Sequence, residues 1–162
     1  MKHFSKRTLI LTAGALILIA IAGTVIYVST RPYVPTTQEQ VRGVVYGFGD
    51  ELSQVQLLEK SATTTADMDK HYSLYIHPDL LTKWKEAPLT APGRTAASPW
   101  PDHIDIRTVT LNENGTYTVE ATVVDKANGI SSTTPAHETP VVITLTQGPD
   151  GWQITSYEEI TS

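Results

Sequence analysis

The chain has 162 residues, no cysteine and a net charge of −5 at pH 7. Without cysteine there is no disulfide framework, so an exported domain must be held together by its apolar core. Three of the twelve Lys and Arg residues precede residue 8, which leaves nine against seventeen Asp and Glu in the rest of the chain. This negative charge argues against nucleic acid as a partner and against electrostatic binding to anionic lipid.

An apolar run covers residues 8–28 without one charge and directly follows the basic tail at 1–7. At 1.5 Å rise per residue, a helix of this length spans about 31 Å, close to the hydrocarbon core of a bilayer. A cleaved signal peptide has a shorter apolar centre and ends in small residues. This run ends instead in Val25-Ile26-Tyr27-Val28. The sequence therefore predicts an uncleaved transmembrane anchor.

The basic residues around the run predict its orientation. The tail at 1–7 is basic, whereas Arg31 is the only basic residue close after the span. The positive-inside rule then places the tail in the cytoplasm and the later residues outside. The predicted organisation is a cytoplasmic tail, an anchor in the cell membrane, a proline-stiffened linker at 29–35 and an extracytoplasmic domain at 36–162. A cysteine-free exported domain is typical of bacteria.

Helical patterns fill the first part of this domain. Thr36 and Glu39 have the spacing of a capping box, and apolar residues at three- and four-residue steps predict a helix to about Lys60. Glycines inside this helix indicate a bend or the close approach of another element. A threonine from the tract that follows is expected to cap a second helix at about 66–76, and Pro78 to begin a short third one.

The period of the pattern changes from 3.6 to 2 after a proline-rich loop at 86–101. Asn114-Gly115 predicts a tight hairpin turn. In the first strand the apolar residues change sides, which predicts a β-bulge near Arg107. The predicted fold class is α+β, with two to three helices packed on a curved antiparallel sheet. Its four strands are expected at 104–111, 117–124, 141–145 and 152–157.

This order of elements resembles the nuclear transport factor two-like superfamily, a group of cystatin-like α+β cones, over about residues 36–160. The resemblance rests on the helix pair, the corner at 75–80, the bend in the first strand and the closing strand at 151–155. It implies a bent sheet wrapped around helices to form a cone with a pocket. An anchor before such a domain also looks like scaffold proteins of conjugation and type IV secretion machines, or accessory domains of wall-synthesis enzymes.

Two polar groups are candidates for chemistry. Asp67 and His71 share a helix face at i, i+4 and could form an acid–base pair, although a solvated surface pair explains them better. The run 102–105 could offer a metal two or three ligands, with His137 as a further one, but a charged outer strand face also explains it. We therefore predict no catalytic residue, no metal and no cofactor.

The loop at 91–101 is the strongest candidate for binding. Arg94 offers a forked donor, and Trp100 between Pro99 and Pro101 offers a flat surface of low entropy. Such residues are typical of recognition hot spots. The alternative is that Trp100 covers the core beside another tryptophan. If the cone is hollow, its pocket is expected to be lined by Phe48, Tyr72, Trp84 and Trp152.

These observations favour a single-pass membrane protein whose outer domain is a non-catalytic binding or assembly module of a bacterial envelope complex. Envelope proteins, or a second copy of the chain, are the expected partners. The alternative is a small-molecule-binding pocket, or a weak lyase or isomerase, of the same fold. A third possibility is a structural spacer without a ligand.

Overall fold

The computed structural model describes residues 35–57, 62–96, 98–126 and 136–160. By its contacts the chain divides after Val34, and residues Pro35–Ser162 form one compact unit. The predicted anchor, and the predicted linker up to residue 34, lie outside the described residues. Within those residues no helix has both the length and the apolar character that crossing a membrane requires.

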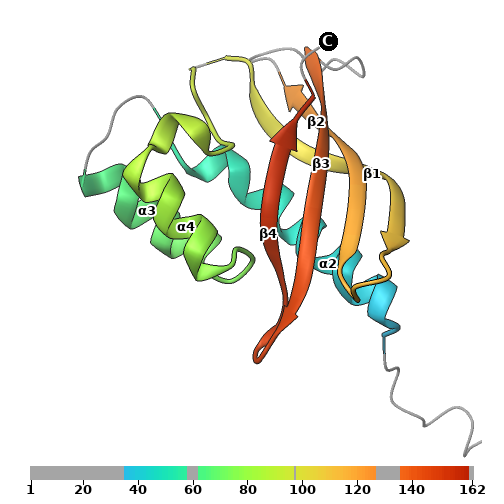
Figure 1. Cartoon of the computed structure of the whole chain (residues 1–162). Coiled ribbons are helices and arrows are strands. Elements are labelled where there is room, and N and C mark those ends of the chain that lie inside the picture. Colours follow the sequence, from blue (N-terminus) through green and yellow to red (C-terminus); the bar gives the residue numbers. More distant parts are fainter. Residues whose placement is uncertain (1–34, 58–61, 97, 127–135, 161–162) are drawn as a thin grey trace, which may run out of the picture. The chain divides into compact units, whose positions relative to one another are not determined.

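In the part of the chain that the structure describes, three α-helices precede the sheet. They are α2 (Thr37–Glu51), α3 (Ala62–Tyr72) and α4 (Pro78–Glu86), and short 3-10 turns follow α2 (Leu52–Gln54) and α4 (Pro88–Thr90). Figure 1 shows α2 running along one face of the sheet, with α3 and α4 beside β4. The first helix starts at the predicted capping box. The backbone N–H of Thr36 donates to Glu39 Oε2 at 2.7 Å, and the backbone N–H of Glu39 donates to Thr36 Oγ1 at 3.3 Å.

The boundary between the first two helices differs from the prediction. The chain leaves the helix after Gln54, because Leu57 N–H donates to the Arg94 carbonyl and Arg94 N–H donates to the Val55 carbonyl, both at 2.9 Å. The threonine tract does not stay outside α3 as a cap. Thr64 is buried within the helix, and its hydroxyl donates to the Gln56 carbonyl at 3.2 Å. A backbone pairing between distant segments therefore decides this boundary.

The sheet is antiparallel, as predicted, and its strands lie in the order β1-β2-β3-β4. Its strands are longer than the sequence pattern indicated, and the first begins at Trp100, inside the predicted loop. The register of β1 against β2 shifts between Ile106 and Thr108, which confirms the bulge at Arg107. The strands are β1 (Trp100–Leu111), β2 (Tyr117–Lys126), β3 (His137–Gly148) and β4 (Gly151–Glu159).

The concave face of the sheet packs on the helices and forms the core. All the residues predicted for the inward face of β2, β3 and β4 are buried, which confirms that face. Its buried members are Tyr117, Val119, Ala121, Val123, Val141, Ile143, Leu145, Trp152 and Ile154. From α2 they meet Val41, Val45 and Phe48, none of which is exposed. The result is a curved sheet closed on one side by helices (Figure 1).

Two glycines of α2 let other elements come unusually close. A Cβ on Gly49 would lie 2.9 Å from the backbone nitrogen of Ile104 in β1. A Cβ on Gly47 would lie 2.6 Å from the ring of Tyr75, in the turn after α3. The close approach predicted from the glycines is therefore present, and it brings α2 directly against the sheet.

Candidate functional site

The concave face of the sheet changes from apolar to polar at one end. Along β2 the inward positions run through Val123 to Asp125, and along β3 the residue that precedes Val141 on this face is Thr139. Val123 pairs with Thr139, and Asp125 pairs with His137. Side chains two apart on a strand share a face, so the core-forming face extends into a polar end.

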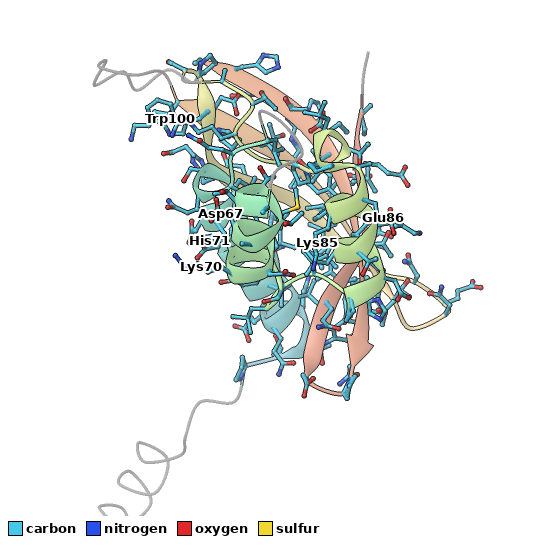
Figure 2. All side chains as sticks on the ribbon, turned by 90° about the vertical axis from the view of Figure 1, so that its left-hand side faces the viewer. Asp67, Lys70, His71, Lys85, Glu86 and Trp100 are labelled. Atoms are coloured by element: carbon cyan, nitrogen blue, oxygen red, sulfur yellow. The ribbon has the colours of Figure 1, made fainter. Side chains whose placement is uncertain are left out.

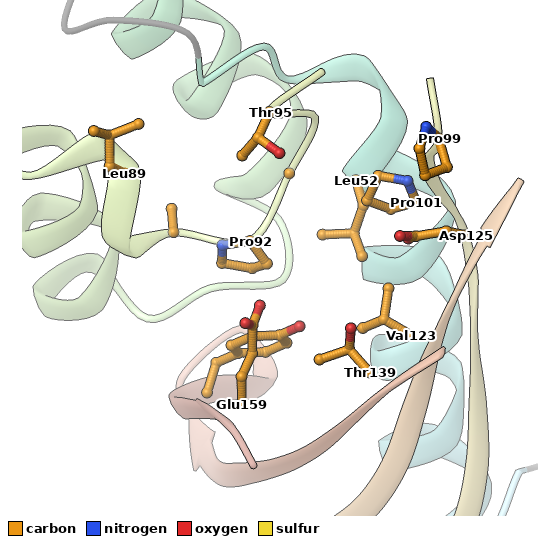
Figure 3. Close-up of a pocket in the computed structure, with 13 residues that line it drawn as sticks. Leu52, Leu89, Pro92, Thr95, Pro99, Pro101, Val123, Asp125, Thr139 and Glu159 are labelled. Atoms are coloured by element: carbon orange, nitrogen blue, oxygen red, sulfur yellow. The ribbon is translucent and has the colours of Figure 1, made fainter. Parts of the chain in front are cut away.

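A cavity of about 260 Å³ lies at this polar end. The turn after α4 and the start of β1 supply apolar walls, and the ends of β2, β3 and β4 supply most of the polar ones (Figure 3). The lining residues are Leu52, Leu89, Ala91, Pro92, Gly93, Thr95, Pro99, Pro101, Val123, Asp125, Thr139, Tyr157 and Glu159. This volume lies below the usual range of drug-sized ligand sites, so it suits a small ligand or one side chain.

Two carboxylates give the cavity a negative potential. Asp125 and Glu159 lie on opposite sides of the hollow (Figure 3). Partial burial raises the pKa of Asp125, while the nearby His137 lowers it again in part. Within the described part of the chain, neither carboxylate forms an ion pair. None of the residues that line the cavity is basic.

Two tyrosines support the cavity: Tyr157 belongs to its wall, and Tyr72 lies behind Pro92. The Tyr72 hydroxyl donates to the Pro92 carbonyl at 2.8 Å and so holds the cavity wall against α3. The Tyr157 hydroxyl is buried and has no hydrogen-bond partner among the described residues. Burial raises the pKa of both phenols far above its usual value, so both stay neutral and can donate.

The predicted recognition residues, here called the rim, lie at this cavity or next to its lining residues in the chain. Pro99 and Pro101 line it, and Trp100 is the first residue of β1 and only half-buried. The Arg94 guanidinium lies 5.2 Å from the centre of the Trp100 ring, within the range of a cation–π contact. Arg94 Nε also donates to the Ala96 carbonyl at 3.0 Å. The structure thus brings all four predicted residues to one place.

Of the four residues predicted to line a pocket, three pack together and the fourth lies elsewhere. Phe48, Tyr72 and Trp84 pack against one another at ring-centre distances of 5.1 to 6.2 Å, with Tyr157 at 6.2 Å from Phe48 and from Trp84. Trp152 packs elsewhere, at 5.1 Å from Tyr117. The centre of the cone is therefore filled with aromatic rings, and the cavity lies beyond them.

The histidine of the candidate pair on α3 contacts Glu51 instead of Asp67. Figure 2 shows Asp67 and His71 along the side of α3. His71 Nδ1 lies 2.6 Å from Glu51 Oε2 at the end of α2, and only 17% of its side chain is exposed. The expectation of a solvated pair is thus wrong for His71, because the packing of α3 on α2 brings Glu51 to it.

The run 102–105 forms an ion-pair group on the sheet. His103 Nδ1 lies 3.0 Å from Asp102, and His103 Nε2 lies 3.5 Å from Asp105. Lys126 approaches Asp102 at 3.7 Å. His137 belongs to the inward face beside Asp125 and not to this group. Across the described ranges, no three His, Asp or Glu side chains come together as a metal site would need.

Sequence reasoning missed Asp125, Thr139, Tyr157 and Glu159 as a group. The sequence did contain a signal. The inward positions of β2 continue beyond Val123 to Asp125, and those of β3 begin with Thr139 before Val141. Reading this alternation onward would have placed Asp125 and Thr139 inside. The contribution of β4 depends on the register shift between Thr144 and Leu145, which the sequence did not indicate.

Comparison with known proteins finds no matching family model and no matching curated protein. Among solved structures, the chain is similar to the intermembrane space region of the chloroplast protein ARC6, with 17% identity and a TM-score of 0.47 over 81% of this chain and 100% of that one. It is also similar to VirB8 of Agrobacterium tumefaciens, with 13% identity and a TM-score of 0.48 over 82% and 99%. At these identities the likeness concerns the arrangement of elements alone.

Proposed function

We propose that the chain is a single-pass membrane protein whose domain at 36–162 acts outside the cytoplasm as a non-catalytic binding and assembly module of a bacterial envelope complex. The apolar run at 8–28 supports the anchor, and the bias of basic residues supports the orientation. The complex is of the conjugation, secretion or cell-wall type. We also propose that this domain belongs to the nuclear transport factor two-like superfamily.

The observation on which this proposal rests is the Arg94–Trp100 pair on the cavity rim. The backbone of Arg94 is fixed by its two hydrogen bonds to the segment after α2, and its guanidinium lies over the half-buried Trp100. Pro99 and Pro101 restrict the flanking backbone. A preorganised Arg–Trp surface loses little entropy on binding, which is what a protein-recognition site requires.

Photo-crosslinking in cells tests this function. A photoreactive residue at the exposed Ala96 probes the rim without altering Arg94 or Trp100, and one at Leu74, which is 75% exposed, serves as the matched control. We expect a discrete adduct from position 96 and none from position 74. The double variant Arg94→Ala, Trp100→Ala should lose that adduct and keep its cooperative thermal unfolding. A folded double variant that still gives the same adduct would exclude the rim.

The cavity favours a second candidate function, the binding of a small molecule. The filled centre of the cone argues against a large ligand, whereas the 260 Å³ at its polar end leaves room for a small one. Within the described residues, no carboxylate and imidazole come together in this cavity with a hydrogen bond that would organise proton transfer. Binding is therefore the activity that this geometry favours over a lyase or isomerase reaction.

A further inference from the structure

We propose that the cavity at the polar end of the sheet binds an alkylammonium group, with the hydrocarbon stem against its proline and valine walls and the ammonium between Asp125 and Glu159. This assignment rests on the small-ligand candidate function and names the chemical class of the ligand. It does not require the assembly role.

Charge is the first argument. Asp125 and Glu159 face one small cavity from β2 and β4, and no basic group among the described residues neutralises them by an ion pair. His137, the cross-strand partner of Asp125, is the nearest titratable neighbour on β3, and Lys126 points to Asp102 instead. A cation that enters the cavity gains both attractions in a partly desolvated place, whereas an anion meets two repulsions.

An unsatisfied phenol is the second, independent argument. The Tyr157 hydroxyl is buried beside this cavity without a hydrogen-bond partner in the described part of the chain. A buried polar group without a partner lowers stability, so a ligand that supplies a donor recovers this loss on binding. An ammonium group has three donors, so it can bond to both carboxylates and still offer one donor to a third oxygen.

The shape and lining of the cavity restrict the rest of the ligand. At about 30 Å³ for each water in the liquid, the volume corresponds to roughly nine waters, and so to a chain of a few carbon atoms with its head group. Pro92, Pro101 and Val123 give apolar walls that suit such a stem. A free small amine and the lysine side chain of a partner protein share this chemistry.

A matched set of probes tests the charge preference. The full chain, labelled with ¹⁵N in a non-ionic detergent, is titrated at pH 7 with n-butylammonium, with n-butanol as the neutral probe of equal length and with butyrate as the anion. We expect saturable amide shifts at Val123 and Thr139 with butylammonium. The dissociation constant for butanol should be at least tenfold higher, and butyrate should not bind.

Variants assign the binding to the carboxylates. Asp125→Asn should raise the dissociation constant for butylammonium at least tenfold without lowering the melting temperature, and Glu159→Gln should raise it as well. Asp150→Asn, in the exposed turn between β3 and β4, removes the same charge away from the cavity and should leave binding unchanged. Unchanged affinity in a folded Asp125→Asn variant would overturn the assignment.

The remaining outcomes distinguish the charge assignment from the small-ligand function. Equal affinity for butanol and butylammonium would overturn the charge assignment and leave the small-ligand function standing, whereas no saturable binding by any probe would remove both. A short peptide with one internal lysine distinguishes the sources. Tighter binding than butylammonium, lost in Trp100→Ala, would indicate the lysine of a protein partner, and equal affinity would indicate a free amine.

Discussion

Gly49 shows how one missing side chain sets the distance between a helix and the sheet. A Cβ there would lie 2.9 Å from the backbone nitrogen of Ile104, and backbone atoms cannot turn aside as a side chain can. We expect Gly49→Ala to lower the free energy of unfolding by about 1–3 kcal/mol, as overpacking of a core does. Urea unfolding of the two proteins measures this difference.

Gly43 provides the control for this prediction. It lies in the same helix, but a Cβ there would meet nothing within 4 Å. Gly43→Ala should therefore raise the free energy of unfolding by up to about 1 kcal/mol, since alanine loses less backbone entropy in a helix than glycine does. If both variants changed stability in the same direction, the close contact between α2 and β1 would be wrong.

Asp125 makes stability depend on pH. Burial raises the pKa of Asp125 in the folded state, so the folded protein holds this proton more tightly than the unfolded chain does. The resulting stabilisation is fully present below the unfolded pKa of about 4 and is lost as the pH rises through the folded pKa. Asp125→Asn should therefore melt slightly above the native protein at pH 7, with the difference shrinking towards pH 4.

Thermal unfolding at both pH values measures this effect. Because Asp125 is only partly buried, we expect the melting temperature of Asp125→Asn to exceed that of the native protein by roughly 1–3 °C at pH 7. His137 beside it opposes the shift and keeps the effect small. A variant that melts below the native protein at pH 7 would mean that the native carboxylate has a stabilising partner.

The same position shows why the residues of the site were hard to predict individually. Asp125 and Thr139 continue an inward alternation, so their direction is local information. Their proximity to Glu159 is not local, because it depends on three strands pairing in one register. Arg94 and Trp100 were predicted from their chemical type, and their contact with each other came only with the fold.

At the scale of elements, the bulge in β1 gives a strand-level prediction. Arg107 is the extra residue between the pairs Ile106–Ala121 and Thr108–Glu120. Deleting Arg107 should leave every other pair in register and remove only the local twist, so the protein should fold with reduced stability. Circular dichroism and a melting curve check this outcome.

A deletion in the neighbouring strand is the control. Glu120 lies opposite this bulge, but β2 itself has no extra residue there: Glu120 pairs regularly with Val142 of β3 and stands between the inward residues Val119 and Ala121. Deleting it would turn one side of the strand from the core to solvent, so this variant should not fold. Equal tolerance of the two deletions would show that Arg107 is not a true extra residue.

Element boundaries followed two kinds of rule. The capping box at Thr36 and the turn at Asn114-Gly115 use neighbouring residues, and both were predicted correctly. The end of α2 was predicted too late, because Gln56 pairs with Arg94 from a distant segment. The residues next to Gln56 in the sequence do not indicate such a pairing.

At the scale of the whole molecule, the predicted topology can be tested because the native chain has no cysteine. Two single-cysteine variants, Ser5→Cys in the tail and Leu74→Cys at a 75% exposed site, report the two sides of the membrane. In intact protoplasts a membrane-impermeant maleimide should label only Leu74→Cys. After lysis it should label both.

The reverse pattern would contradict the predicted orientation. Labelling of both variants in intact cells would contradict the cytoplasmic tail. Extraction of the protein by alkaline carbonate would contradict the anchor itself, since a helix of about 31 Å in the bilayer core resists that treatment. The unaltered chain, which carries no thiol, is the control for background labelling.

Sequence patterns alone were sufficient for the fold class, the inward face of the sheet and the bulge, because each follows from a period of a few residues or from side-chain volume. The cavity depended on tertiary structure, since its walls come from segments between Leu52 and Glu159. The same holds for the filled centre of the cone. Aromatic rings from α2, α3, α4 and β4 meet there, and only the packing of these elements determines whether rings close a space or line it.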